Sequence, residues 1–175
     1  MGEYFGASLL AIRVDQRGGA YDNLLVGAPQ FTQPDGMDEG RVYVYRSYGN
    51  GLVFDIVLDG GATSQSRFGT SIADIGDINM DGYNDVAVGA PFEDNVGAVY
   101  VYHGARDSTF RGNYAQRILA SQIASKTGAA LRGFGFSISK GYDADKIATM
   151  VCRECNLGTR NSRYQRRQCY ILTES

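Results

Sequence analysis

The sequence predicts an all-β protein of the propeller class, and three observations lead to this prediction. A set of short motifs repeats along the chain at a spacing of roughly 60 residues, which is typical of proteins built from similar structural units. The repeated segments are rich in valine and tyrosine, which favour strands. Glycine makes up 23 of the 175 residues, which indicates many tight turns and close backbone contacts. Four short antiparallel strands per repeat, without a helical period, are typical of one propeller blade.

Three motifs define the repeat and recur in the same order. They are Phe-Gly at Phe5, Phe68 and Phe134, a segment ending in Gly-Ala-Pro at 24–29 and 86–91, and Val-Tyr-Val-Tyr at 42–45 and 99–102. The phenylalanines of the first motif lie 63 and 66 residues apart. A β-sandwich also contains many short strands, but it does not repeat a signature after every fourth strand. The propeller interpretation is therefore favoured over the sandwich.

The repeats divide the chain into units. We expect a first blade over residues 1–66, with its outer strand at 52–58, and a second blade over residues 67–132, with its outer strand at 114–120. A third unit begins over residues 133–146.

Residues 147–175 match nothing in a blade and are interpreted as a divergent basic tail. This segment holds five arginines against two glutamates, together with all three cysteines of the chain. Cys152, Cys155 and Cys169 do not suffice for a zinc site, because a fourth ligand is missing.

The composition excludes some classes of function. The net charge of −2 argues against nucleic acid as a partner. No apolar run approaches the ~18 residues that a membrane-spanning helix needs. The N-terminal residues do not resemble a signal peptide, so the chain is expected to be either cytosolic or an internal fragment of a longer protein.

One loop of the second unit carries the residues expected to bind a metal ion. Oxygen-bearing side chains occupy positions one, three, five and nine of the segment 77–85, and Gly82 at position six allows a sharp turn. This alternation is typical of a calcium loop, in which every second residue points toward the ion. The expected Ca²⁺ ligands are Asp77, Asn79, Asp81, the backbone carbonyl of Tyr83, and Asp85.

Two other interpretations of this loop are weaker. An EF-hand needs a glutamate at position twelve, where this chain has Val88 inside the next strand. A turn rich in Asp, Asn and Gly needs two or three such residues for its geometry, but not four oxygen-bearing side chains in alternating register.

The corresponding loop of the first unit provides a comparison, because it places Asp15, Arg17, Gly19 and Asn23 at the four ligand positions. An arginine at position three and a glycine at position five predict that this loop does not bind calcium.

The motifs resemble the FG-GAP repeats of integrin α subunits. Phe-Gly opens each unit, the loop 77–85 follows the pattern D-x-[DN]-x-D-G-x-x-D, and Gly-Ala-Pro closes the second strand. The resemblance covers residues 4–146 and implies the last three blades of a seven-bladed propeller, with calcium loops on its lower face that support the structure.

The resemblance also implies a receptor function. The parent protein would be a membrane-anchored subunit at the cell surface that pairs with an integrin β subunit and binds matrix or cell-surface protein ligands. In this family an aromatic residue after Phe-Gly can contact an arginine of the β subunit, and Phe136 occupies that position.

Two alternatives to an integrin receptor belong to other classes of function. A secreted calcium-binding FG-GAP propeller protein would share the fold and the ion but would have no β partner. An enzyme is disfavoured because no serine or cysteine lies in a nucleophile motif, and the lone His103 follows directly after a strand. The carboxylates clustered at 77–85 are already accounted for by calcium.

Overall fold

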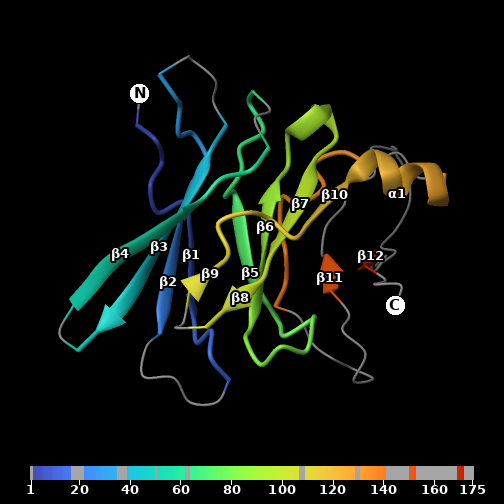
Figure 1. The fold of residues 1–175 in the computed structure, drawn as a ribbon. Helices are drawn as coiled ribbons and strands as arrows, with labels where there is room; N and C mark the ends of the chain where they lie inside the picture. Colours follow the sequence, from blue (N-terminus) through green and yellow to red (C-terminus); the bar gives the residue numbers. More distant parts are fainter. Residues whose placement is uncertain are drawn as a thin grey trace.

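The computed structural model is predominantly β, as the sequence predicts, and contains two four-stranded antiparallel sheets of the kind found in propeller blades. It describes residues 2–16, 22–34, 39–49, 51–61, 64–106, 109–128 and 131–140, together with the backbone of 150–152 and 169–171. Residues 141–146 of the third unit and most of the tail 147–175 therefore lie outside the described part. Figure 1 shows the two large sheets next to each other.

The first sheet is a meander in which each strand pairs with the next one along the chain. Its strands are β1 (Ser8–Ile12), β2 (Asn23–Ala28), β3 (Arg41–Tyr48) and β4 (Gly51–Leu58). The predicted outer strand at 52–58 is confirmed as β4. β2 ends at Ala28, directly before Pro29, which has no N–H to continue the ladder.

The second sheet repeats this arrangement, with the order β5, β6, β7 and β10 from its first strand to its outer strand. Its strands are β5 (Ser71–Gly76), β6 (Asp85–Ala90), β7 (Ala98–Tyr102) and β10 (Gln116–Leu119). The outer strand lies where it was expected, although it is shorter than 114–120. A small hairpin of β8 (Gly104–Ala105) and β9 (Thr109–Phe110) is inserted between β7 and β10.

Further short elements were not predicted from the sequence. They are the helix α1 (Ala120–Thr127), the 3₁₀ turn η1 (Glu93–Asn95), and the paired strands β11 (Met150–Cys152) and β12 (Cys169–Ile171). α1 has eight residues, of which Ile123 is the only large apolar one, and this is too few to establish a helical period from the sequence. The helix ends at Gly128, whose left-handed backbone (φ 70°) is typical of a C-terminal cap.

Each unit docks on the preceding sheet through the turn at its Phe-Gly motif. A side chain added at Gly27 would lie 2.2 Å from the carbonyl oxygen of Gly69, and one at Gly89 would lie 1.9 Å from that of Gly135. The glycine of Gly-Ala-Pro is therefore required where the next unit approaches, because no side chain fits between the two backbones. Ser8 and Ser71 strengthen the same two junctions by donating hydrogen bonds to these carbonyls, at 2.7 and 2.8 Å.

The phenylalanine of the motif fills the space between the two sheets. Phe68 is completely buried, and its ring packs edge-on against Tyr100, with 5.3 Å between centroids. Its backbone pairs with Gly40 of the first unit, and Gly60 lies against the ring. The main core is formed here, between β2 and β3 on one side and β6 and β7 on the other.

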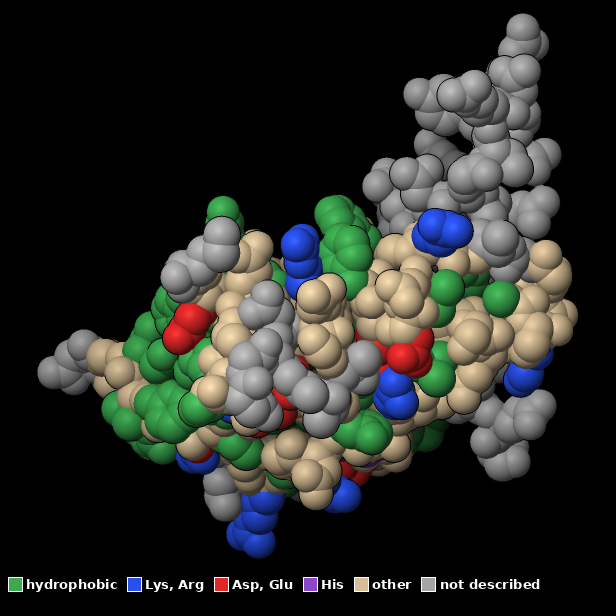
Figure 2. Space-filling view, turned by 90° about the horizontal axis from the view of Figure 1, so that it is seen from above, with side chains coloured by type: hydrophobic (Ala, Val, Ile, Leu, Met, Phe, Trp, Pro, Cys, Tyr) green, Lys and Arg blue, Asp and Glu red, His purple; other side chains and the backbone are tan. Residues whose placement is uncertain are grey.

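The connections lie at two opposite ends of the sheets, as the antiparallel order requires. β2 meets β3, β4 meets β5 and β6 meets β7 at one end, whereas β1 meets β2 and β5 meets β6 at the other (Figure 1). Some apolar surface stays exposed on the outer strand β4, where Leu52, Val53 and Phe54 are each more than half exposed. Figure 2 shows hydrophobic side chains gathered on the side of the molecule where this strand lies. No helix among the described residues is long and apolar enough to cross a membrane.

Candidate metal centre

The candidate ion-binding loop connects β5 to β6, which is the position that the sequence predicts. Its turn is tight, because Met80 and Gly82 both have positive φ angles, of 57° and 91°. The value at Gly82 lies in the region that favours glycine, which accounts for the glycine at position six.

The carboxylate of Asp77 organises the turn. Its Oδ1 accepts a hydrogen bond from the backbone N–H of Asp81 at 3.0 Å, and its Oδ2 accepts one from Gly82 at 2.7 Å. Asp81 uses its side chain in the same way, since Oδ1 accepts from the N–H of Tyr83 at 3.0 Å. The amide of Asn79 donates to Asp81 Oδ2 at 2.9 Å. The three side chains at positions one, three and five are thus drawn together by the curl of the backbone.

Asp85 closes the loop at position nine and is fully buried at the start of β6. Oδ2 accepts a hydrogen bond from the N–H of Ile78, and Oδ1 accepts one from the N–H of Gly104, both at 2.9 Å. Nδ1 of His103 lies 3.2 Å from Oδ2. Burial raises the pKa of the Asp85 carboxyl, while the two N–H groups and His103 act in the opposite direction. A buried carboxylate of this kind is favoured by a nearby positive charge.

The donor set is of the type that calcium prefers, although its side chains do not yet surround a common point. Among the described residues, no group of three or more Asp, Glu, His or Cys side chains is close enough to hold a metal ion. The carboxylate oxygens can nevertheless bind a further partner. An ionised carboxylate has about four acceptor positions, and the backbone N–H bonds described above use only some of them. Three carboxylates, one amide oxygen and one backbone carbonyl match the all-oxygen coordination of a hard cation. The chemistry of these donors therefore fits a calcium ion, which Asp77, Asn79, Asp81, Asp85 and the carbonyl of Tyr83 would hold.

In the first unit, the position that corresponds to Asp85 is occupied by a residue without an acidic group. Asn23 corresponds to Asp85 and is also buried, with 1% of its surface exposed. A buried neutral amide requires hydrogen bonds but no compensating charge, so this sheet has no electrostatic need for a cation. Arg17 and Gly19 of this loop lie outside the described residues.

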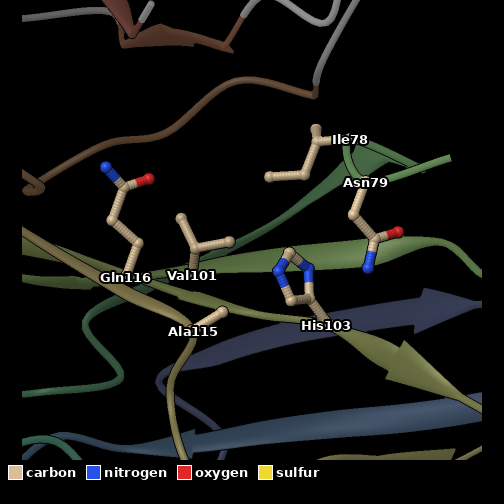
Figure 3. Close-up of a pocket in the computed structure, with 6 residues that line it drawn as sticks. All are labelled: Ile78, Asn79, Val101, His103, Ala115 and Gln116. Carbon is tan, nitrogen blue, oxygen red and sulfur yellow. The ribbon is translucent and has the colours of Figure 1, made fainter. Parts of the chain in front are cut away.

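A pocket of about 400 Å³ adjoins the loop. It is lined by Ile78, Asn79, Val101, His103, Ala115 and Gln116. Figure 3 shows Asn79 and His103 at one end of this pocket and Gln116 at the other. Solvent therefore reaches the part of the loop that carries Asn79.

Two features of the site were not foreseen from the sequence. Gly104 donates its N–H to the buried Asp85 and His103 lies beside the same carboxylate, although these two residues come 19 and 18 positions later in the chain. A side chain at Gly104 would lie 2.4 Å from the carbonyl oxygen of Asn84, so a glycine is required there. A glycine two residues after the Val-Tyr-Val-Tyr strand gave no signal of this contact, because strands are commonly followed by glycine. The other expected site residue, Phe136, follows the third Phe-Gly motif and is 56% exposed.

Comparison with known proteins identifies the repeats. The family model of the FG-GAP repeat matches residues 68–102, which include the candidate loop and strands β5 to β7. The chain is 42% identical to human integrin alpha-11 over 148 residues, which is 83% of this chain and 12% of that protein. It belongs to the FG-GAP repeat region of the integrin α family.

Related integrins of other animals agree with this assignment. Integrin alpha-PS3 of Drosophila melanogaster is 42% identical over 82% of the chain, and mouse integrin alpha-2 is 42% identical over 77%. The chain spans only about an eighth of the length of these integrins, 12% in each case. The integrin α family is a family of receptors and not of enzymes, in agreement with the expectation from the sequence.

Proposed function

We propose that this chain is part of the propeller head of a cell-adhesion receptor, an integrin α subunit that mediates adhesion to matrix and to other cells. The observation that carries this proposal is the identity of 42% with integrin alpha-11 over 83% of the chain. The parent protein is then anchored in the plasma membrane, with this segment on the extracellular side. The units proposed from the sequence, 1–66, 67–132 and 133–146, are three successive blades of that head.

Within this head, the loop 77–85 binds Ca²⁺ and supports the structure. The support for this role is the set of oxygen donors on one tight turn, together with the buried carboxylate of Asp85. Extracellular calcium modules operate with dissociation constants of about 10⁻⁴–10⁻³ M, so this site does not need high affinity. At a calcium concentration ten times the dissociation constant, binding adds about 1.4 kcal/mol to the free energy of unfolding.

The calcium role is tested by thermal unfolding of the chain with and without calcium. We expect calcium to raise the Tm by about 4 °C, which corresponds to the stabilisation given above. Asp81→Ala removes one ligand and is expected to abolish this increase. Asp22→Ala is a matched control, because it removes one exposed carboxylate from the corresponding loop of the first unit, where Asp22 pairs with Arg13 at 2.9 Å. An equal response to calcium in wild type and Asp81→Ala would contradict the assignment.

The proposed partner is an integrin β subunit, and ligands bind at the end of the sheets opposite the calcium loop. Phe136 is the proposed β contact, supported by its position after Phe-Gly and by its exposed ring. Coprecipitation of the β subunits of the same cells with the parent α chain tests this, and Phe136→Ala is expected to reduce the amount recovered. A parent chain that is secreted and recovers no β subunit would instead favour the secreted FG-GAP protein.

A further inference from the structure

A segment of the first unit lies antiparallel to the proposed calcium loop of the second unit. The N–H of Asn84 donates to the carbonyl of Val14 at 2.7 Å, and the N–H of Gln16 donates to the carbonyl of Gly82 at 3.3 Å. Between these two bonds, Asp15 stands opposite Tyr83 in a β-bridge. Residues 13–16 and 82–84 thus form a short two-stranded ladder, which we call the loop clamp.

The side chain of Asn84 adds two further bonds to the loop clamp. Its Nδ2 donates to the carbonyl of Arg13 at 2.8 Å, and its Oδ1 accepts from Nε2 of Gln16 at 2.7 Å. Both ends of this amide are therefore used across the junction between the units. Asn84 occupies position eight of the loop, between the proposed ligands Tyr83 and Asp85, and is not itself a ligand.

The packing behind the loop clamp connects it to the ligand positions. Val14 is completely buried in the main core, and Gly104 approaches it so closely that a side chain on this glycine would lie 2.9 Å from a Val14 methyl group. The same glycine donates its N–H to the carboxylate of Asp85. A displacement of residues 13–16 would therefore leave Asn84 without its partners and disturb the backbone on both sides of it, where the ligands lie.

We propose that Asn84 is a positioning residue that couples calcium binding in the second unit to the docking of the first unit. The first unit's loop, which has only one carboxylate among its four ligand positions, serves instead as the segment against which the neighbouring calcium loop is ordered. This inference rests on the proposed calcium site. Coupling of this kind is reciprocal. An intact loop clamp raises the affinity for calcium by a certain factor, and bound calcium strengthens the junction between the units by the same factor.

Hydrogen exchange of the full chain, with and without calcium, tests the coupling. In the wild type, calcium is expected to slow exchange both in the loop 77–83 and in the segment 13–16. In Asn84→Ala, calcium still slows exchange in the loop, but its effect on the segment 13–16 decreases. The affinity for calcium falls about fivefold, as expected for a net loss of roughly one hydrogen bond. Gln16→Ala is expected to give a smaller change of the same kind, and because Gln16 is exposed this variant retains the fold.

Arg13→Ala provides the matched control. Its side chain pairs with Asp22 and makes no bond to Asn84, so this variant changes the same segment without removing the clamp's bonds. If Asn84→Ala and Arg13→Ala respond to calcium alike, Asn84 is not the coupling residue. If calcium protects 77–83 but not 13–16 in the wild type, the coupling is overturned while the calcium site stands. If calcium protects neither segment, the calcium site itself is refuted and the coupling with it.

Discussion

The two four-stranded sheets share their strand order and motifs but differ in the polar groups placed between them. Two residues after the proline of Gly-Ala-Pro, the first unit has Phe31 and the second has Glu93. The guanidinium of Arg41 lies 3.9 Å from the centroid of the Phe31 ring. Glu93 is instead fully buried and accepts hydrogen bonds from Nε of Arg117, at 2.6 Å, and from the hydroxyl of Tyr100.

The same contrast is found at the opposite end of the sheets, where Asn23 corresponds to Asp85. In both cases the second unit buries a carboxylate where the first has a neutral side chain. Burial raises the pKa of the Tyr100 phenol, and its hydrogen bond to Glu93 acts in the same direction, so Tyr100 remains the proton donor of this pair. The backbone repeat therefore tolerates either a neutral or a charged side chain at these positions, and a buried charge requires partners from several segments at once.

The largest effect is expected from the phenylalanine of the Phe-Gly motif. Phe68 and Phe5 make equivalent ring contacts within their units, with centroids 5.3 Å from Tyr100 and 5.4 Å from Tyr43. Only Phe68 is covered by a preceding sheet, whereas Phe5 is 55% exposed. Phe68→Ala is expected to lower the free energy of unfolding by about 3–5 kcal/mol, and Phe5→Ala by less than about 1 kcal/mol.

Urea unfolding of the two variants measures this difference. Similar losses in both variants would show that the ring of Phe5 is also covered in solution, and the comparison between the two units would then fail.

A smaller effect is expected at Glu93. Glu93→Gln keeps the size of the side chain but removes the charge that binds Arg117, so the free energy of unfolding should fall by about 2 kcal/mol. Phe31→Leu removes the cation–π contact with Arg41 at the corresponding place and is expected to cost about 0.5–1 kcal/mol. The midpoints and slopes of denaturant unfolding provide both values. An equal cost would mean that the buried charge contributes no more than the contact that replaces it in the first unit.

The smallest difference between the two units is expected at the serines of the two junctions. Ser8→Ala and Ser71→Ala each remove one hydrogen bond to a carbonyl of the next unit, at 2.7 and 2.8 Å. Each is expected to lower the free energy of unfolding by about 1 kcal/mol. Differential scanning calorimetry can compare the two variants directly. A clear difference between them would show that the two junctions are not equivalent despite their matching geometry.

Much of the fold could be predicted because the strand signals are local and repeated. The outer strand at 52–58 and the loop between β5 and β6 were located from residue type and spacing alone. The helix α1 was missed because eight residues with one large apolar side chain are too few to distinguish a helix from a turn by pattern. The contacts of Asp85 with His103 and Gly104 could not be predicted either, because these residues meet only after β7 has paired with β6.

The order of the main strands within a unit and the residues proposed to bind calcium follow from the sequence alone, because both depend on side-chain type at a fixed spacing. Only the tertiary structure decided why Gly27 and Gly89 must be glycine, since the carbonyl that excludes a side chain belongs to the following unit. It also decided that Asn84 faces the first unit, because the contact with Arg13 joins residues 71 positions apart. Such contacts depend on how two sheets pack, and packing is set by the whole of both surfaces rather than by any local pattern.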